Sequence, residues 1–281
     1  MSRSYRPRGD KDFWSAAIDN KASFMQYYTR LVELATSMFR WVNLPDSVDE
    51  RFLEMSLFTD GMAIFFNDDV LGYLALKTLI SGNLDVYNIP IKRQAYSTTN
   101  YRKNLTNKDS VIIFNNYLHT NSMLDVKLFA TRLADLDRAI DINAKAQKTP
   151  ILLSCDEKTR LSLKNVYAQY DGNMPVINSY KGLNPESIKV LTTGAPFVAD
   201  KLYQLKTDIW NEALTYLGIS NVSFQKKERM VSDEVMRSLG GTLASRASRL
   251  EMRRQACKQI NNMFGLNIWC EFREEYGNLD E

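Results

Sequence analysis

Apolar residues recur at helical spacing in several long stretches of the chain. Between Asp12 and Trp41 they return every three or four residues, which predicts an N-terminal helix. From Leu124 to Pro150 the apolar positions are fewer and the other faces are charged. They form a narrow, heptad-like seam of Val126, Phe129, Leu133, Leu136 and Ile140. Such a seam predicts either a helix that packs against neighbouring helices or an amphipathic surface helix.

A second long helix is predicted from Pro196 to Gly218, since proline favours a helix start and glycine a helix end. Its seam has similar spacing and consists of Val198, Leu202, Leu205, Ile209 and Tyr216. Between the two helices, ILLSC, MPVINSY and ESIKVL predict strands, and EKTRLSLKNVYAQY predicts a helix. The pattern therefore indicates a small α/β module flanked by two seamed helices.

Residues 60–120 favour strands and turns. GMAIFF, DVYNIPIKRQAYS and SVIIFNNYL are rich in β-forming residues and are bounded by Gly, Asn and Asp. Before this region, the pattern breaks at Pro45 and restarts with acidic residues. This predicts a helix with Asp46 or Ser47 as its N-cap.

The segment 221–238, NVSFQKKERMVSDEVMRS, is too polar to fill a core. The glycine pair 240–241 adds flexibility, and a final helix is predicted at about 243–264, with LNIWCEF after it as a strand. That helix is strongly basic through Arg246, Arg249, Arg253, Arg254 and Lys258. A basic helix of this kind is compatible with a monomeric or dimeric DNA-binding protein.

The composition is that of an ordinary globular protein. The 281 residues are 44% apolar and 25% charged, and the formal net charge is only +3. Any contact with nucleic acid must therefore rest on locally placed charge. Three widely spaced cysteines (Cys155, Cys257 and Cys270) fit a reducing compartment. We expect no signal peptide, because the N-terminal stretch has no apolar core region. We expect no transmembrane helix, because charges interrupt the apolar stretches.

Catalytic motifs are missing from the sequence. His119 is the only histidine, and neither a P-loop, a G-x-S-x-G motif nor a dinucleotide fingerprint occurs. The acidic pairs Asp68–Asp69 and Asp135/Asp137 are interpreted as solvated charges. We expect His119 to be structural, with no metal ion and no cofactor, and an enzyme is the weaker class.

Longer strings carry a family resemblance. NAKAQKTPILL, LSLKNVYAQYDGNMPVI, VADKLYQLKTDIWNEALTYLGI, KKERMVSDEV and FGLNIWCEFR resemble the portal, or upper collar, proteins of small short-tailed bacteriophages with protein-primed linear genomes. WVNLP and SGNLDVYN extend the resemblance into the N-terminal half. It runs in order from about residue 20 to about residue 273.

The resemblance implies a mainly α fold with α+β modules, assembled as a homo-oligomeric ring of about twelve subunits. Such a ring forms in the host cytoplasm and sits at one capsid vertex of the virion. It conducts double-stranded viral DNA during packaging and ejection. The implied partners are the packaging ATPase, lower collar and tail proteins, and capsid and scaffolding proteins, with no membrane. The portal itself is not the ATPase, which agrees with the missing P-loop.

The family plan also implies a division of the chain. Its parts are a basic arm (1–12), a wing (13–123), a stem helix (124–149), a narrow-end or clip α/β module (150–196), a second stem helix (197–219), a channel loop (220–242), and a C-terminal helix and strand at the wide end (243–281).

In this family the segment matching 221–238 projects into the channel. The resemblance therefore makes Lys226, Lys227 and Arg229 candidates for contacting DNA phosphates, contacts that carry no sequence information. The residues alone favour a solvated surface loop instead.

Lys201 matches a second channel-facing lysine of the family, whereas a further family lysine position is Thr192 here. The alternative for Lys201 is a structural ion pair with Asp200 or Asp208.

In the best-known relative of this family, a basic N-terminal arm helps to contact a packaging RNA. Arg3, Arg6 and Arg8 are the matching candidates for contacting RNA or the packaging motor, but they are not tightly clustered, so RNA binding does not follow. A disordered terminus is the alternative. For the whole chain, the other hypotheses are a different virion ring component, such as a lower collar or adaptor, and the helical DNA-binding protein.

Overall fold

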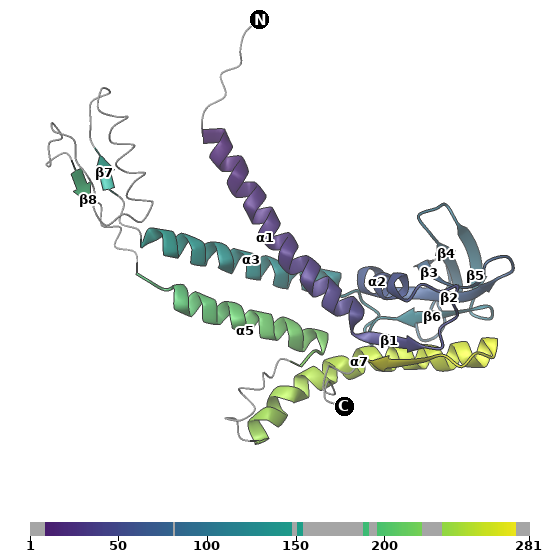
Figure 1. The fold of residues 1–281 in the computed structure, drawn as a ribbon. Coiled ribbons are helices and arrows are strands. Elements are labelled where there is room, and N and C mark those ends of the chain that lie inside the picture. The colour runs from purple at the N-terminus through teal and green to yellow at the C-terminus, as the bar shows by residue number, and fades with distance from the viewer. Residues whose placement is uncertain are drawn as a thin grey trace, which may run out of the picture. The chain divides into compact units, whose positions relative to one another are not determined.

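A computed structural model of the chain describes residues 9–80, 82–147, 151–153, 188–190, 196–220 and 232–273 (Figure 1). The chain folds into two compact units. Unit 1 comprises Met1–Asp135 and Lys206–Glu281, and unit 2 comprises Leu136–Leu205. The described helices are α1 (Gly9–Ser37), α2 (Glu50–Asp60), α3 (Met123–Ala146), α5 (Ala199–Leu217) and α7 (Ser232–Phe264). The described strands are β1 (Phe39–Val42), β2 (Met62–Asp68), β3 (Gly72–Ile80), β4 (Lys92–Tyr96), β5 (Arg102–Thr106), β6 (Ser110–Phe114), β7 (Ile151–Leu153), β8 (Ile188–Val190) and β9 (Trp269–Phe272).

An antiparallel sheet of order β5-β4-β3-β2-β6 confirms the strands predicted between residues 60 and 120. Side chains alternate along β2, as they must on a pleated strand. Phe65 points into the main core of unit 1, whereas Ile64 and Phe66 pack with Ala95 and Leu105 on the other face. The sheet is therefore buried on both faces around β2.

Asp68 closes the β2–β3 hairpin and is not the solvated charge that the sequence predicted. One carboxylate oxygen accepts hydrogen bonds from the backbone N–H groups of Val70 and Leu71, each at 3.1 Å. The other accepts from the Tyr101 hydroxyl at 2.6 Å and from the Lys103 ammonium at 3.0 Å. These donors, Tyr101 first, hold the pKa of Asp68 well below its usual range.

Helix α2 begins two or three residues later than the sequence predicted. Its N-cap is Asp49 rather than Asp46 or Ser47, and the Asp49 carboxylate accepts a hydrogen bond from the backbone N–H three residues on, at 2.8 Å. The helix ends at Gly61, whose φ of 81° favours glycine. A β-carbon at this position would lie 2.7 Å from backbone atoms of the loop before α3.

Strands β1 and β9 pair in antiparallel register and join two distant parts of unit 1. This confirms the strand predicted for LNIWCEF. Cys270 on β9 and Cys257 on α7 are both buried free thiols. Burial raises the pKa of Cys257 to about 12 and also raises the pKa of Cys270, which disfavours the thiolate form of both side chains.

Helix α7 starts at Ser232, about ten residues before the predicted start near Leu243. Gly240 and Gly241 therefore lie within a helix and do not form a flexible joint. A glycine in a helix interior lowers helix stability by about 1 kcal/mol relative to alanine. Helix α7 has 33 residues, and its other residues compensate for this loss. Within the predicted channel loop 220–242, residues 232–242 are helical and residues 221–231 lie outside the described part.

The α3 seam is confirmed, but its first half is buried within the subunit. Val126, Phe129 and Leu133 belong to the unit 1 core and are at most 9% exposed. In unit 2, Leu136 and Ile140 are half-buried. The first half of the seam therefore packs against other elements of the same chain.

The α5 seam is only partly as predicted. In unit 1 the helix buries Ala213 and Leu217 and ends at Gly218, which has a φ of 87°. A β-carbon on Gly218 would lie 2.8 Å from the Arg246 Cα. In unit 2, Leu205 of the predicted seam is 47% exposed.

Unit 2 contains the paired strands β7 and β8, which confirms the strands predicted in ILLSC and ESIKVL. The side chain of Asn143 accepts a hydrogen bond from the Val198 N–H and donates one to the Pro196 carbonyl, both at 3.0 Å. The predicted helix EKTRLSLKNVYAQY and strand MPVINSY lie outside the described residues.

Candidate functional site

Arg253 of the basic helix α7 is buried and serves as an internal anchor. It is 2% exposed, and its Nε and Nη2 donate to the two carboxylate oxygens of Glu54 on α2 at 2.9 and 2.7 Å. Its Nη1 donates to the Asn115 carbonyl at 3.1 Å, and Trp41 Nε1 donates to Glu54 at 2.8 Å. Burial by itself would lower the pKa of Arg253, but the Glu54 carboxylate keeps it above its usual value.

Arg249, one turn earlier on α7, is also withdrawn from solvent. It is 5% exposed, and its guanidinium carbon lies 4.8 Å from the ring centroid of Tyr216. Burial lowers the pKa of Arg249. Two of the five basic residues that the sequence analysis named on this helix are thus structural. Their charges are buried, so they are not available to a DNA-binding face of the helix.

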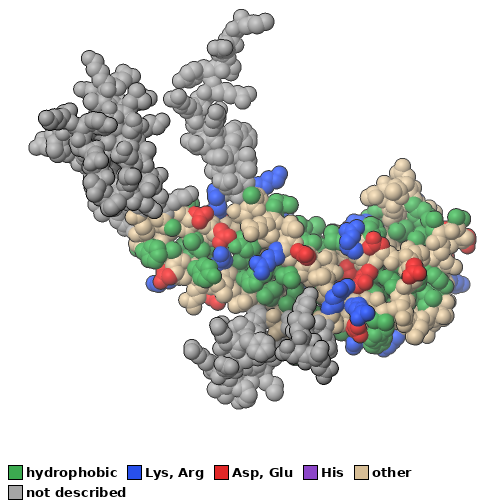
Figure 2. All heavy atoms as spheres, viewed as in Figure 1, with side chains coloured by type: hydrophobic (Ala, Val, Ile, Leu, Met, Phe, Trp, Pro, Cys, Tyr) green, Lys and Arg blue, Asp and Glu red, His purple; other side chains and the backbone are tan. Residues whose placement is uncertain are grey.

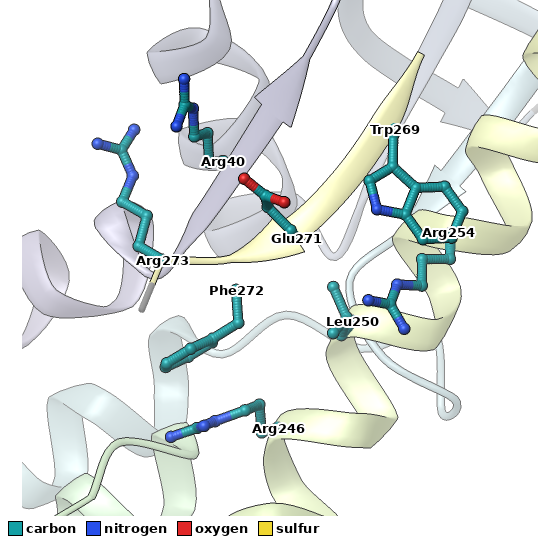
Figure 3. A pocket seen from close by; sticks show the side chains of 8 residues that line it. All are labelled: Arg40, Arg246, Leu250, Arg254, Trp269, Glu271, Phe272 and Arg273. Atoms are coloured by element: carbon teal, nitrogen blue, oxygen red, sulfur yellow. The ribbon is translucent and has the colours of Figure 1, made fainter. Parts of the chain in front are cut away.

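Arg246 and Arg254 of α7 line a concave surface, which we call the arginine groove (Figure 3). It has a volume of about 830 Å³ and is formed by β1, β9 and α7 of unit 1. Its lining residues are Arg40, Arg246, Leu250, Arg254, Trp269, Glu271, Phe272 and Arg273. Four guanidinium groups and one carboxylate make the groove cationic.

Aromatic rings and carbonyl groups fix two of these guanidinium groups. The Arg246 guanidinium carbon lies 3.6 Å from the Phe272 ring centroid, and its Nε donates to the Gly218 carbonyl at 2.9 Å. The Arg254 guanidinium carbon lies 4.8 Å from the Trp269 ring centroid, and the Arg254 Nε donates to the Cys270 carbonyl on β9 at 3.3 Å. Guanidinium groups stacked in this way are pre-oriented to donate hydrogen bonds through their edges.

The outer side of the arginine groove comes from the β1–β9 ribbon. Arg40 is exposed and lies opposite Glu271 in the antiparallel register. The side chain of Arg273 is 54% exposed, and its Nη2 lies 3.2 Å from Glu50. The sequence prediction missed this groove. The alternation of polar and aromatic residues in FRWV and WCEFR was the available signal, because it places residues 40, 269, 271 and 273 on one ribbon face.

A second feature is apolar. On α3 in unit 1, Leu124 is 64% exposed and Leu128 is 53% exposed, one turn apart. Large apolar side chains are also exposed in unit 2, namely Ile142, Phe197, Tyr203 and Leu205. Figure 2 shows apolar side chains among charged ones over the described part of the face in view.

The family comparison decides what kind of protein carries these surfaces. Residues 15–276 match the model of the family described as Phage Connector (GP10), which is nearly the whole chain. The chain belongs to the phage connector family. These are the portal, or head–tail connector, proteins of bacteriophages, so the resemblance noted in the sequence is confirmed.

One solved phage structure agrees with the connector fold, and two others match less well. The chain resembles one from the portal and tail of native bacteriophage P68, with a TM-score of 0.54 and 15% identity over 98% of this chain and 94% of that chain. It also matches an HK97 family phage portal protein from Corynebacterium diphtheriae, with a TM-score of 0.45 and 12% identity over 88% and 91% of the two chains. A chain from the virion of a native gene transfer agent particle matches with a TM-score of 0.48 and 11% identity over 92% and 85%.

Of the DNA-contacting residues expected in this connector, Lys201 is described. It is exposed in the first turn of α5. The other candidates lie outside the described residues: Lys226, Lys227, Arg229, Thr192, Arg3, Arg6 and Arg8.

His119 of the connector has a structural environment. Its ring stacks on Phe114, with 3.6 Å between centroids, and burial lowers the pKa of His119. Within the ranges that the structure describes, no three His, Cys, Asp or Glu side chains form a group that could hold a metal ion. No helix in the described part of the chain is long and apolar enough to cross a membrane.

Proposed function

We propose that this connector forms a homo-oligomeric ring of about twelve subunits at one capsid vertex. The ring conducts double-stranded viral DNA during packaging and ejection. It acts as a structural conduit without catalysis of its own. The packaging ATPase and the lower collar and tail proteins dock on it, and capsid and scaffolding proteins surround it.

The family match over residues 15–276 is the observation that carries this proposal. The likeness to a chain from the portal and tail of bacteriophage P68 supports it, because it extends over 98% of this chain. The alternative is that the chain is a different ring component of the virion, such as a lower collar or adaptor, and an experiment must distinguish this from a portal.

The exposed apolar side chains on the stem helices support self-assembly. Leu124 and Leu128 stand on the side of α3 that the core of unit 1 leaves uncovered. Isolated exposed leucines are common, but large apolar residues one turn apart on a long helix suit a helix–helix interface. In a closed ring each subunit presents one such surface to the next.

For the conduit we propose sequence-blind contact with DNA phosphates. Lys201 on α5 and the residues Lys226, Lys227 and Arg229 are the candidate cations. Duplex DNA presents one negative charge per about 1.7 Å of axis, so a ring of cations always has partners. Acidic neighbours such as Glu228 would weaken the hold and allow DNA to slide.

Electron microscopy of the purified chain, with its mass measured by light scattering, tests the proposal. A ring of about twelve subunits with a central hole is the expected result. Labelling in virions then separates a portal from a lower collar, since only a portal sits within the capsid vertex. A stable monomer or dimer that binds a short duplex would contradict the proposal.

A further inference from the structure

The arginine groove is a cationic surface built from three elements of unit 1. Two of its arginines are held against aromatic rings and backbone carbonyls, as described above. Arg40 and Arg273 add charge from the ribbon, and both are exposed. Side chains fixed in this way lose little conformational entropy on binding an anion, so the groove is prepared for a carboxylate or phosphate ligand.

The sequence that follows the groove is acidic. Residues 274–281, EEYGNLDE, come directly after Arg273 and contain four acidic residues and no basic one. Eight residues reach at most about 26 Å from Arg273 when extended at about 3.3 Å each. Because Arg273 itself lines the groove, the whole segment is tethered at its rim.

We propose that the arginine groove binds the acidic segment 274–281 of its own chain. The groove volume of about 830 Å³ is in the range that encloses small ligands, about 300–1,000 Å³. It therefore suits a few extended residues, whereas a duplex is too wide to enter and would touch the rim alone. The tether also gives the segment a high effective concentration.

Occupation of the groove would mask a cationic surface of the subunit. Without an anion of its own chain, the cationic rim of the groove would bind DNA phosphates without sequence preference. An acidic segment in the groove prevents this, because its carboxylates take the donors that phosphates would use. The proposal does not depend on ring formation.

Hydrogen–deuterium exchange of the segment in the full-length chain provides the test. In the wild type at low salt, the amides of residues 274–281 should exchange about tenfold more slowly than their intrinsic rates, since several exposed charge pairs together give protection of this order. Arg40→Glu should remove that protection, because Arg40 is exposed and its replacement does not disturb the core. Arg102→Glu on β5 is the matched control, since Arg102 is exposed and does not line the groove.

A second variant removes the charge from the ligand instead. Replacing Glu274, Glu275, Asp280 and Glu281 by their amides should abolish protection while α7 exchanges as in the wild type. Adding Glu274→Lys and Glu275→Lys to Arg40→Glu should restore at least about threefold protection of the segment amides. The combined variant exchanges the signs of the charges on the groove and on the segment, so the two attract each other again.

Three outcomes would overturn the proposal. The first is a segment that exchanges at intrinsic rates in the wild type. The second is protection that Arg40→Glu leaves intact, or that depends on protein concentration, which would indicate a neighbouring subunit's segment. The third is an unprotected segment combined with binding of a 20-base-pair duplex that Arg40→Glu weakens and Arg102→Glu does not, which would assign the groove to nucleic acid.

Discussion

Arg253 places a full positive charge in the interior of unit 1. The carboxylate of Glu54 and the carbonyl of Asn115 receive its donors, and Trp41 binds the same carboxylate. The four residues come from α7, α2, β1 and the loop after β6. A buried ion pair of this kind adds little net stability over an apolar replacement, but each partner depends strongly on the other.

Glu54→Gln should therefore destabilise the subunit by about 3–5 kcal/mol, because it leaves the Arg253 charge buried without its counter-ion. The free energy of unfolding in urea measures the effect. The double variant Glu54→Met/Arg253→Met should lose less than the two single variants together. Glu33→Gln, at an exposed position on α1, serves as the control and should change little. Additive losses would contradict the coupling.

At the scale of elements, α3 carries apolar residues on two sides. Val126, Phe129 and Leu133 face the core of unit 1, whereas Leu124 and Leu128 are exposed. A substitution on the seam therefore tests the folding of one chain. Only a substitution at the exposed positions tests the contact between chains.

Leu128→Asp should leave the subunit folded, with its free energy of unfolding changed by about 0.5 kcal/mol or less, yet block ring formation. Leu133→Asp should unfold the subunit, since Leu133 is fully buried and a charge there costs several kcal/mol. Circular dichroism and light scattering measure the two effects separately. Thr131→Asp, also exposed on α3, is the matched control. Normal rings from Leu128→Asp would rule out this face as the interface.

Periodicity predicted the helices and strands of the described chain well, because the alternation of apolar and polar residues reflects burial directly. It did not reveal which partner covers a seam, so Leu133 and Leu205 looked alike although one is buried and the other exposed. Single-residue rules failed where tertiary contacts decide. Gly240 and Gly241 indicated a joint but lie in α7, and the charges of Arg253 and Asp68 indicated solvent but satisfy internal partners.

For the whole molecule, the chain's near-balanced charge means that local clusters decide what the ring holds. The chain carries two sets of cationic residues that do not overlap. One is the proposed channel set with Lys226, Lys227 and Arg229, and the other is the arginine groove of unit 1.

Replacing Lys226, Lys227 and Arg229 by alanine should leave ring assembly intact and reduce retention of packaged DNA, because the phosphate contacts of the conduit are lost. The measurements are electron microscopy of the rings and the amount of DNA kept in filled heads. The control is a triple variant at exposed basic residues outside the segment 221–238, Lys92→Ala with Arg102→Ala and Lys108→Ala, which should retain DNA normally. Failure of the first variant to assemble would make the segment structural.

The shared carboxylate of Glu54 also constrains how the sequence can diverge. Arg253, Glu54 and Trp41 meet at one carboxylate, and Arg253 also needs the Asn115 carbonyl. Replacement of Glu54 or Arg253 alone passes through a poorly folding intermediate, so changes at these two positions are expected to be concerted. In distant relatives the arginine and the carboxylate should be kept together or be exchanged together for an apolar pair, which makes positions 54 and 253 a covarying pair separated by 199 residues.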